Sequence, residues 1–197
     1  MIHAFDRFLQ VVKAGQAGKV VPTSYIEVDS VRLATLSEEE KNKSLLFSVI
    51  GESLAPEGIH TGFILIATKS GPDFSFSQLE KGDLIILKIS DNMENTKEAN
   101  LKIRKYLTTI DLNAPLEELW DKACSEDDLS IEEGKKDLFK RKYEKALSCI
   151  SANERKNVLL SITYTSENGR EYSFHPNKKF YAKVNAYIDN DNKMVEL

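Results

Sequence analysis

Short apolar runs, separated by glycines and polar turns, constrain the fold of this chain more than any other feature. Three of them are six or seven residues long and rich in β-branched or aromatic side chains: LLFSVIG (45–51), FILIAT (63–68) and DLIILKI (83–89). Runs this short with such boundaries predict buried strands, because a helix usually needs at least about ten residues. LKIRKYL (101–107) alternates apolar and basic residues, which predicts a strand with one buried and one open face.

The segment 114–153 interrupts this pattern and predicts two helices, 114–128 and 131–150, with Trp120 as a core anchor. After it, an Asn-Gly pair at 168–169 predicts a hairpin, and 179–189 a last strand. The fold class is therefore mainly β with a two-helix insertion, α+β overall.

The first 36 residues are expected to form an N-terminal arm, followed by one β-domain over 37–197. Residues 2–13 have apolar positions at helical spacing and predict a short amphipathic helix. AGQAG (14–18) predicts a loop, and 19–36 is rich in Val, Ile, Thr and Tyr, which favours extended structure.

The composition narrows the function classes. A net charge of −4 argues against a surface that coats nucleic acid, so we expect no direct nucleic-acid binding. No apolar run approaches the roughly 20 residues of a membrane span, and the N-terminus lacks signal-peptide organisation. The two cysteines, Cys124 and Cys149, fit a reducing cytoplasm better than a disulfide framework. No Cys/His cluster has metal-ligand spacing, so no metal or cofactor is expected.

Ser53 is the candidate nucleophile, in the glycine-rich stretch between two predicted strands (VIGESLAPEGIHTGFILIATK, 49–69). A serine needs a base, supplied either by a histidine–acid pair or by a lysine kept neutral by burial. No histidine stands in a context that indicates a triad, although His60 lies only seven residues from Ser53. Lys102 on a neighbouring predicted strand is the favoured base, with Lys105 as the alternative.

Lys88 is a third possibility, but a lysine at a strand end is usually solvated. Lys102 and Lys105 have odd spacing, so a regular strand directs them to opposite faces and only one of them could face the serine.

These residues resemble the nucleophile segment of the LexA/UmuD family of self-cleaving serine–lysine peptidases. Gly51, Ser53, Gly58, Ile59 and Gly62 match the family pattern in order, and an apolar strand follows. The segment 81–89 is similar to the family's next strand, and ANLKIRKY (99–106) falls where the family carries its catalytic lysine. Departures are Leu54 in place of methionine, and Thr61 and Phe63 where the family usually has acids. The loops 70–82 and 90–100 are also longer than usual, and the helices of 114–153 are not a common part of the family.

The resemblance implies a scissile bond between a small residue and glycine in the arm. Ala17–Gly18 is favoured, because Gly18 precedes Ser53 by 35 residues, a separation similar to that in the family; Ala14–Gly15 is the alternative. The resemblance also implies that backbone N–H groups near Glu52 and Ser53 stabilise the oxyanion.

The resemblance favours a UmuD-like regulator, because no DNA-binding domain precedes the arm. It implies a cytoplasmic, homodimeric protein of a bacterial or phage stress (SOS) response. Its partners would be a RecA filament, a repressor or a DNA polymerase, with no membrane partner. The alternative is a catalytically inactive interaction module on the same fold, an antirepressor or repressor-associated factor that presents 114–153 to a partner. A third hypothesis is a signal-peptidase-like enzyme that acts in trans, although the absence of a membrane anchor argues against it.

Overall fold

The computed structural model describes residues 2–4, 10–13, 27–29, 44–71, 76–89, 100–127, 133–191 and 193–197. The described residues fall into two compact units. The first unit comprises 1–74, 84–103 and 181–197, and the second comprises 75–83 and 104–180. The fold is mainly antiparallel β-sheet with two α-helices, so the predicted fold class is confirmed at this level. The predicted boundary between residues 36 and 37 stays a prediction.

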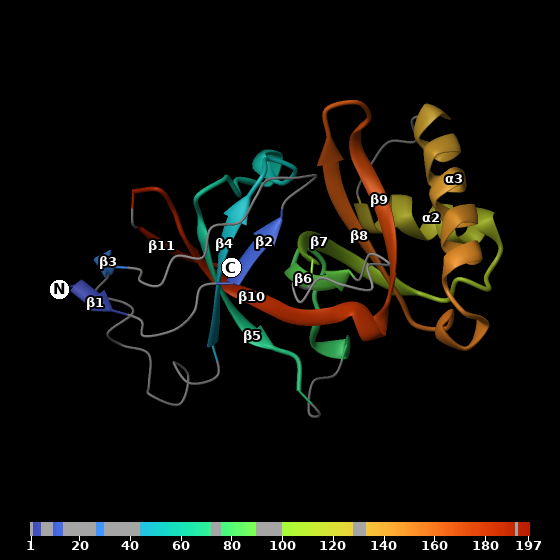
Figure 1. Ribbon diagram of the computed structural model, residues 1–197. Coiled ribbons are helices and arrows are strands. Elements are labelled where there is room, and N and C mark those ends of the chain that lie inside the picture. Colours follow the sequence, from blue (N-terminus) through green and yellow to red (C-terminus); the bar gives the residue numbers. More distant parts are fainter. Residues whose placement is uncertain are drawn as a thin grey trace. The chain divides into compact units, whose positions relative to one another are not determined.

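Strand pairings in the first unit form a ring. The hydrogen-bonded order is β11 (Met194–Glu196), β10 (Phe180–Ile188), β5 (Ile64–Lys69), β4 (Ser44–Ile50), β2 (Gln10–Lys13) and β7 (Asn100–Ile110). A further strand, β6 (Leu84–Ile89), pairs with both β10 and β7 and closes the ring. Among the described strands, closure leaves no edge within the ring; β11 pairs with β10 and lies outside the ring. Figure 1 shows β2 beside β4.

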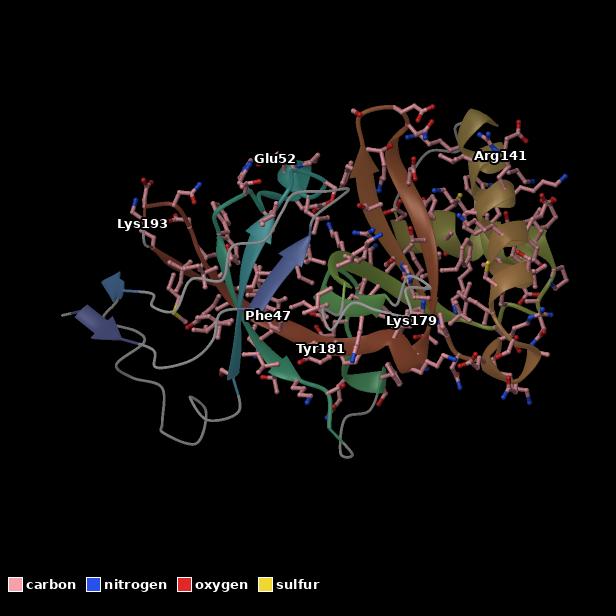
Figure 2. The ribbon with its side chains drawn as sticks, viewed as in Figure 1. Phe47, Glu52, Arg141, Lys179, Tyr181 and Lys193 are labelled. Atoms are coloured by element: carbon pink, nitrogen blue, oxygen red, sulfur yellow. The ribbon has the colours of Figure 1, made fainter. Side chains whose placement is uncertain are left out.

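The strands that the apolar runs predict supply the interior of this unit. Phe47 and Leu65 are fully buried and lie opposite each other on β4 and β5. The Phe47 ring also packs edge-on against Tyr181, with centroids 6.2 Å apart; both residues are labelled in Figure 2. Leu84–Leu87 on β6 are all buried, as the short apolar runs predict for buried strands.

The predicted helix over 2–13 is wrong. Ile2–Ala4 forms β1, which pairs antiparallel with β3 (Glu27–Asp29), and Gln10–Lys13 forms β2. Hydrogen bonding to β3, β4 and β7 outweighs the helical spacing of the apolar residues, as tertiary context often does for short segments.

The second unit packs its two helices on a three-stranded antiparallel sheet. β8 (Val158–Thr165) pairs with β7 and with β9 (Gly169–Pro176). The helices α2 (Leu116–Asp127) and α3 (Glu133–Cys149) confirm the two helices predicted within 114–153. Figure 1 shows α3 alongside β9. The core between these elements includes Trp120, which is 3 % exposed, so its predicted role as a core anchor is confirmed.

A buried carboxylate ties α3 to the β8–β9 hairpin. Glu171 on β9 is 5 % exposed and accepts hydrogen bonds from Lys142 Nζ at 2.8 Å, Thr165 Oγ1 at 2.9 Å and Asn168 Nδ2 at 2.7 Å. Burial alone raises the pKa of Glu171, but these hydrogen bonds outweigh it and lower the pKa below its ordinary value. The carboxylate therefore stays charged in the folded state at neutral pH.

Glu171→Gln is expected to reduce the acid sensitivity of this unit. Because the pKa of Glu171 is lower in the folded state, its charge stabilises the fold above the unfolded pKa of about 4.3, and this contribution is lost as pH falls through the folded pKa. We expect the variant to lose about 1–3 kcal/mol at pH 7 and less at pH 3. Urea unfolding at both values measures this, and an equal loss at both would contradict it.

Candidate functional site

The loop that carries Ser53 joins two adjacent strands. It leaves β4 after Ile50 and enters β5 at Ile64, and the two strands pair antiparallel. Gly51 opens the loop with a φ of 101°, a conformation that side-chain-bearing residues rarely adopt. Leu54 is fully buried and Ile59 is 1 % exposed, so the middle of the loop is anchored in the core.

Ser53 presents a buried hydroxyl. Its Oγ is shielded from solvent and makes no hydrogen bond to any residue that the structure describes. A turn serine that caps its own backbone would satisfy its hydroxyl locally. The contacts of Ser53 therefore do not support a role as a turn residue that caps the backbone. Ser53 Oγ also makes no hydrogen bond to Lys102 or His60.

Strand β2 lies between the strand that leads to Ser53 and the strand that carries Lys102. It runs parallel to β4, with Gln10 opposite Phe47 and Lys13 opposite Ile50. It also pairs parallel to β7, with Lys13 opposite Lys102. Adjacent strands are about 4.8 Å apart, so the backbones at Ile50 and Lys102 are about 10 Å apart across β2. Residues in register share a face, so Ile50 and Lys102 direct their side chains to the same side.

The three candidate lysines differ in their surroundings. Lys102 is half-buried and belongs to the first unit, as does Ser53. Lys105 is also half-buried, but it belongs to the second unit and lies opposite Ile162 on β8. Lys88 on β6 is exposed, as expected for a strand-end lysine. Lys102 lies opposite Lys13 of β2, the strand that leads to the candidate scissile bonds. Of the three lysines, it is therefore the best placed to act as the base.

Glu52 links the two sides of the Ser53 loop. Its carboxylate accepts a hydrogen bond from the Thr61 backbone N–H at 3.1 Å and contacts His60 Nδ1 at 3.2 Å. The Gly51 N–H donates to Thr61 Oγ1 at 2.9 Å. We call these contacts of Gly51, Glu52, His60 and Thr61 the Glu52 clasp. Hydrogen bonds from Thr61, followed by those from His60, lower the pKa of Glu52 below its usual value. Figure 2 shows Glu52 at the loop beyond β4.

Of the remaining predicted site features, the structure describes the oxyanion donors but not the scissile bonds. Both candidate scissile bonds, Ala14–Gly15 and Ala17–Gly18, lie outside the described residues; Ala14 follows Lys13, the last residue of β2. The predicted oxyanion donors, the N–H groups of Glu52 and Ser53, come directly after Gly51. The Glu52 carbonyl accepts from the Ala55 N–H at 3.0 Å, which makes this segment a tight turn.

The sequence analysis missed the pairing of Glu52 with His60. The acid stands eight residues before the histidine, and no periodic spacing marks a contact between two points of an irregular loop. Both residues lie in the glycine-rich stretch 49–69, and this shared location was the only sign of their contact in the sequence. Within the described ranges, no group of three or more His, Cys, Asp or Glu residues is arranged to hold a metal ion.

No protein-family profile, curated protein or solved structure matches this chain. In the part of the chain that the structure describes, no helix has the length and apolar character needed to cross a bilayer.

Proposed function

We propose that this chain is a self-cleaving serine–lysine peptidase-type regulator with a LexA/UmuD-like fold, which cuts its own N-terminal arm. One observation carries the proposal: β2 pairs with both β4 and β7, and Lys13 is opposite both Ile50 and Lys102. The chain that follows β2 thus starts between the strand that leads to the nucleophile and the strand of the base. An extended substrate segment held by backbone pairing is a common way to present a peptide.

The chemistry assigns one role to each residue. Ser53 Oγ attacks the carbonyl carbon of Ala17, or of Ala14 in the alternative, while neutral Lys102 accepts the serine proton. The peptide C–N bond then breaks, and the lysine donates the proton to the leaving glycine amine. Water hydrolyses the resulting ester and regenerates Ser53. The N–H groups of Glu52 and Ser53 stabilise the oxyanion.

Because the arm belongs to the same chain as the site, the reaction would not depend on the affinity of the site for a separate substrate. A scissile bond in the same chain as the nucleophile reacts as an intramolecular group, and orientation of this kind can contribute several kcal/mol, on the order of 7–11 in favourable cases. A regulator built in this way needs a signal that completes the site, because Ser53 Oγ makes no hydrogen bond to a described base. A RecA filament is the signal that the family resemblance suggests, and a homodimer is the expected assembly.

The test is the intact mass of the protein after incubation at neutral and mildly alkaline pH, with and without an activated RecA filament. We expect loss of the first 17 residues, or of the first 14 if Ala14–Gly15 is cut. Ser53→Ala should keep the chain whole under every condition. Cleavage that persists in Ser53→Ala, or a wild-type chain that stays intact throughout, would refute the proposal.

A second candidate function is an inactive interaction module on the same fold, and the setting of Phe63 favours it. Phe63 occupies a position where the family usually has an acid; it is 8 % exposed and stacks on Tyr187 with ring centroids 5.2 Å apart. At this position beside the proposed site, the chain thus has a packed aromatic side chain where the family usually has a charged one. In this reading α2 and α3 contact a protein partner, and Ser53 is not required.

A further inference from the structure

We infer that Glu52 is a positioning residue, whose carboxylate fixes the loop that presents Ser53 by holding Thr61 and His60 across it. This inference rests on the proposed peptidase function, and it assigns a task to a residue next to the nucleophile. It starts from the contacts of the Glu52 clasp, which join residues eight to ten positions apart.

Ser53 is restrained on both sides in the chain. On the C-terminal side, Leu54 is fully buried, and its carbonyl accepts hydrogen bonds from Glu57 N–H at 2.9 Å and Ile59 N–H at 3.1 Å. On the N-terminal side, the Glu52 side chain is 58 % exposed, so burial does not hold it. Its contacts with Thr61 and His60 supply the restraint that burial supplies at Leu54.

Further hydrogen bonds beside the Glu52 clasp hold the end of the loop that leads into β5. The Gly62 N–H donates to the Val49 carbonyl at 3.0 Å, one residue after Thr61. Gly62 has a φ of 94°, and an added Cβ would lie 2.6 Å from Asn190 Oδ1, so this turn requires glycine. Asn190 Nδ2 donates to the Thr61 carbonyl at 3.3 Å and holds the clasp from a third segment. Specific hydrogen bonds therefore hold the chain just before Ser53 and the far end of its loop.

The direction of the Glu52 carboxylate matters for the oxyanion. Its two oxygens are engaged with His60 and Thr61, so both already have partners other than the N–H groups of Glu52 and Ser53. A freed carboxylate could accept from those same donors and compete with the developing oxyanion. Loss of the clasp would thus displace the nucleophile and leave the loop open to non-productive hydrogen bonds.

The experiment compares Glu52→Ala with Glu52→Gln, and uses Glu167→Ala, an exposed acid in the turn between β8 and β9, as a control. Under conditions where the wild type cleaves, we expect Glu52→Ala to lower the first-order rate about 10- to 100-fold, the size of effect that misplacement by about 1 Å produces. Glu52→Gln should stay within about threefold of the wild type, because the amide oxygen still accepts from the Thr61 N–H. Glu167→Ala should cleave at the wild-type rate.

Two further readouts separate positioning from general stability. Thermal midpoints should be nearly equal for all variants, since Glu52 is exposed; rates that merely follow the midpoints, with no rescue by glutamine, would overturn the proposal. Hydrogen exchange of residues 51–62 should accelerate in Glu52→Ala alone, and an unchanged exchange would also overturn it. A wild-type chain that never cleaves would refute the peptidase function, and with it the role of Glu52 in positioning a nucleophile. Exchange would still decide whether the Glu52 clasp holds the loop.

Discussion

Lys102→Met will stop self-cleavage, while Lys105→Met will leave it near the wild-type rate. Lys102 is opposite Lys13 of the arm strand, whereas Lys105 is opposite Ile162 of the second unit. Removing a positioned general base typically costs about 10²- to 10⁴-fold in rate. Methionine keeps most of the aliphatic stem of lysine, so the half-buried side chain is replaced with little loss of packing. Intact mass against time measures both rates.

The pH dependence gives the decisive control for this prediction. A lysine acts as a base only when neutral, so the wild-type rate should rise with pH until the base is deprotonated. The same rise should persist in Lys105→Met. If Lys105→Met abolishes cleavage and Lys102→Met does not, the base is Lys105. If both variants cleave normally, neither Lys102 nor Lys105 is the base, and Lys88 and the pair of His60 with Glu52 become the next candidates to test.

The strands and helices of the described core were predictable because their sequences carry strong local signals. The runs 45–51, 63–68 and 83–89 became β4, β5 and β6 with boundaries shifted by one residue. The two helices predicted at 114–128 and 131–150 became α2 and α3. Such segments bury a face at a regular period, and their environment leaves few alternatives.

Two expectations failed because distant residues decide them. The helix over 2–13 was lost to pairing of β1 with β3 and of β2 with β4 and β7. The open face predicted for 101–107 is wrong at Arg104, which is only 7 % exposed. Burial lowers the pKa of Arg104 to about 10, and attraction to Glu171 partly offsets this effect. A buried partner 67 positions along the chain leaves no local signal in the alternating pattern.

The place of Ser53 between two strands was predictable from the sequence, but the contacts around it were not. The glycine and serine pattern placed Ser53 in a loop between two strands, where the structure has it. The position of the arm strand between β4 and β7 depends on pairing between segments far apart in sequence. The Glu52 clasp depends on how an irregular loop closes, for which no periodicity exists.

Phe139→Ala will destabilise the second unit by about 3–5 kcal/mol, the range expected for a fully buried phenylalanine. Phe139 on α3 is 0 % exposed, and its ring packs edge-on against three aromatic side chains. The centroid distances are 5.2 Å to Trp120, 5.4 Å to Tyr172 and 5.2 Å to Phe174. Removing the ring leaves a cavity where α2, α3 and β9 meet, and it removes all three contacts at once.

Urea unfolding followed by tryptophan fluorescence measures this loss, because Trp120 is the only tryptophan and reports on this core alone. Lys140→Ala, an exposed neighbour on α3, should change stability by less than about 0.5 kcal/mol. A loss below about 1 kcal/mol in Phe139→Ala would contradict the packing described here. Circular dichroism recorded in the same titration follows both units. If its transition coincides with the fluorescence transition, the two units unfold cooperatively; if it separates, the unit with Ser53 stays folded when the helical unit is destabilised.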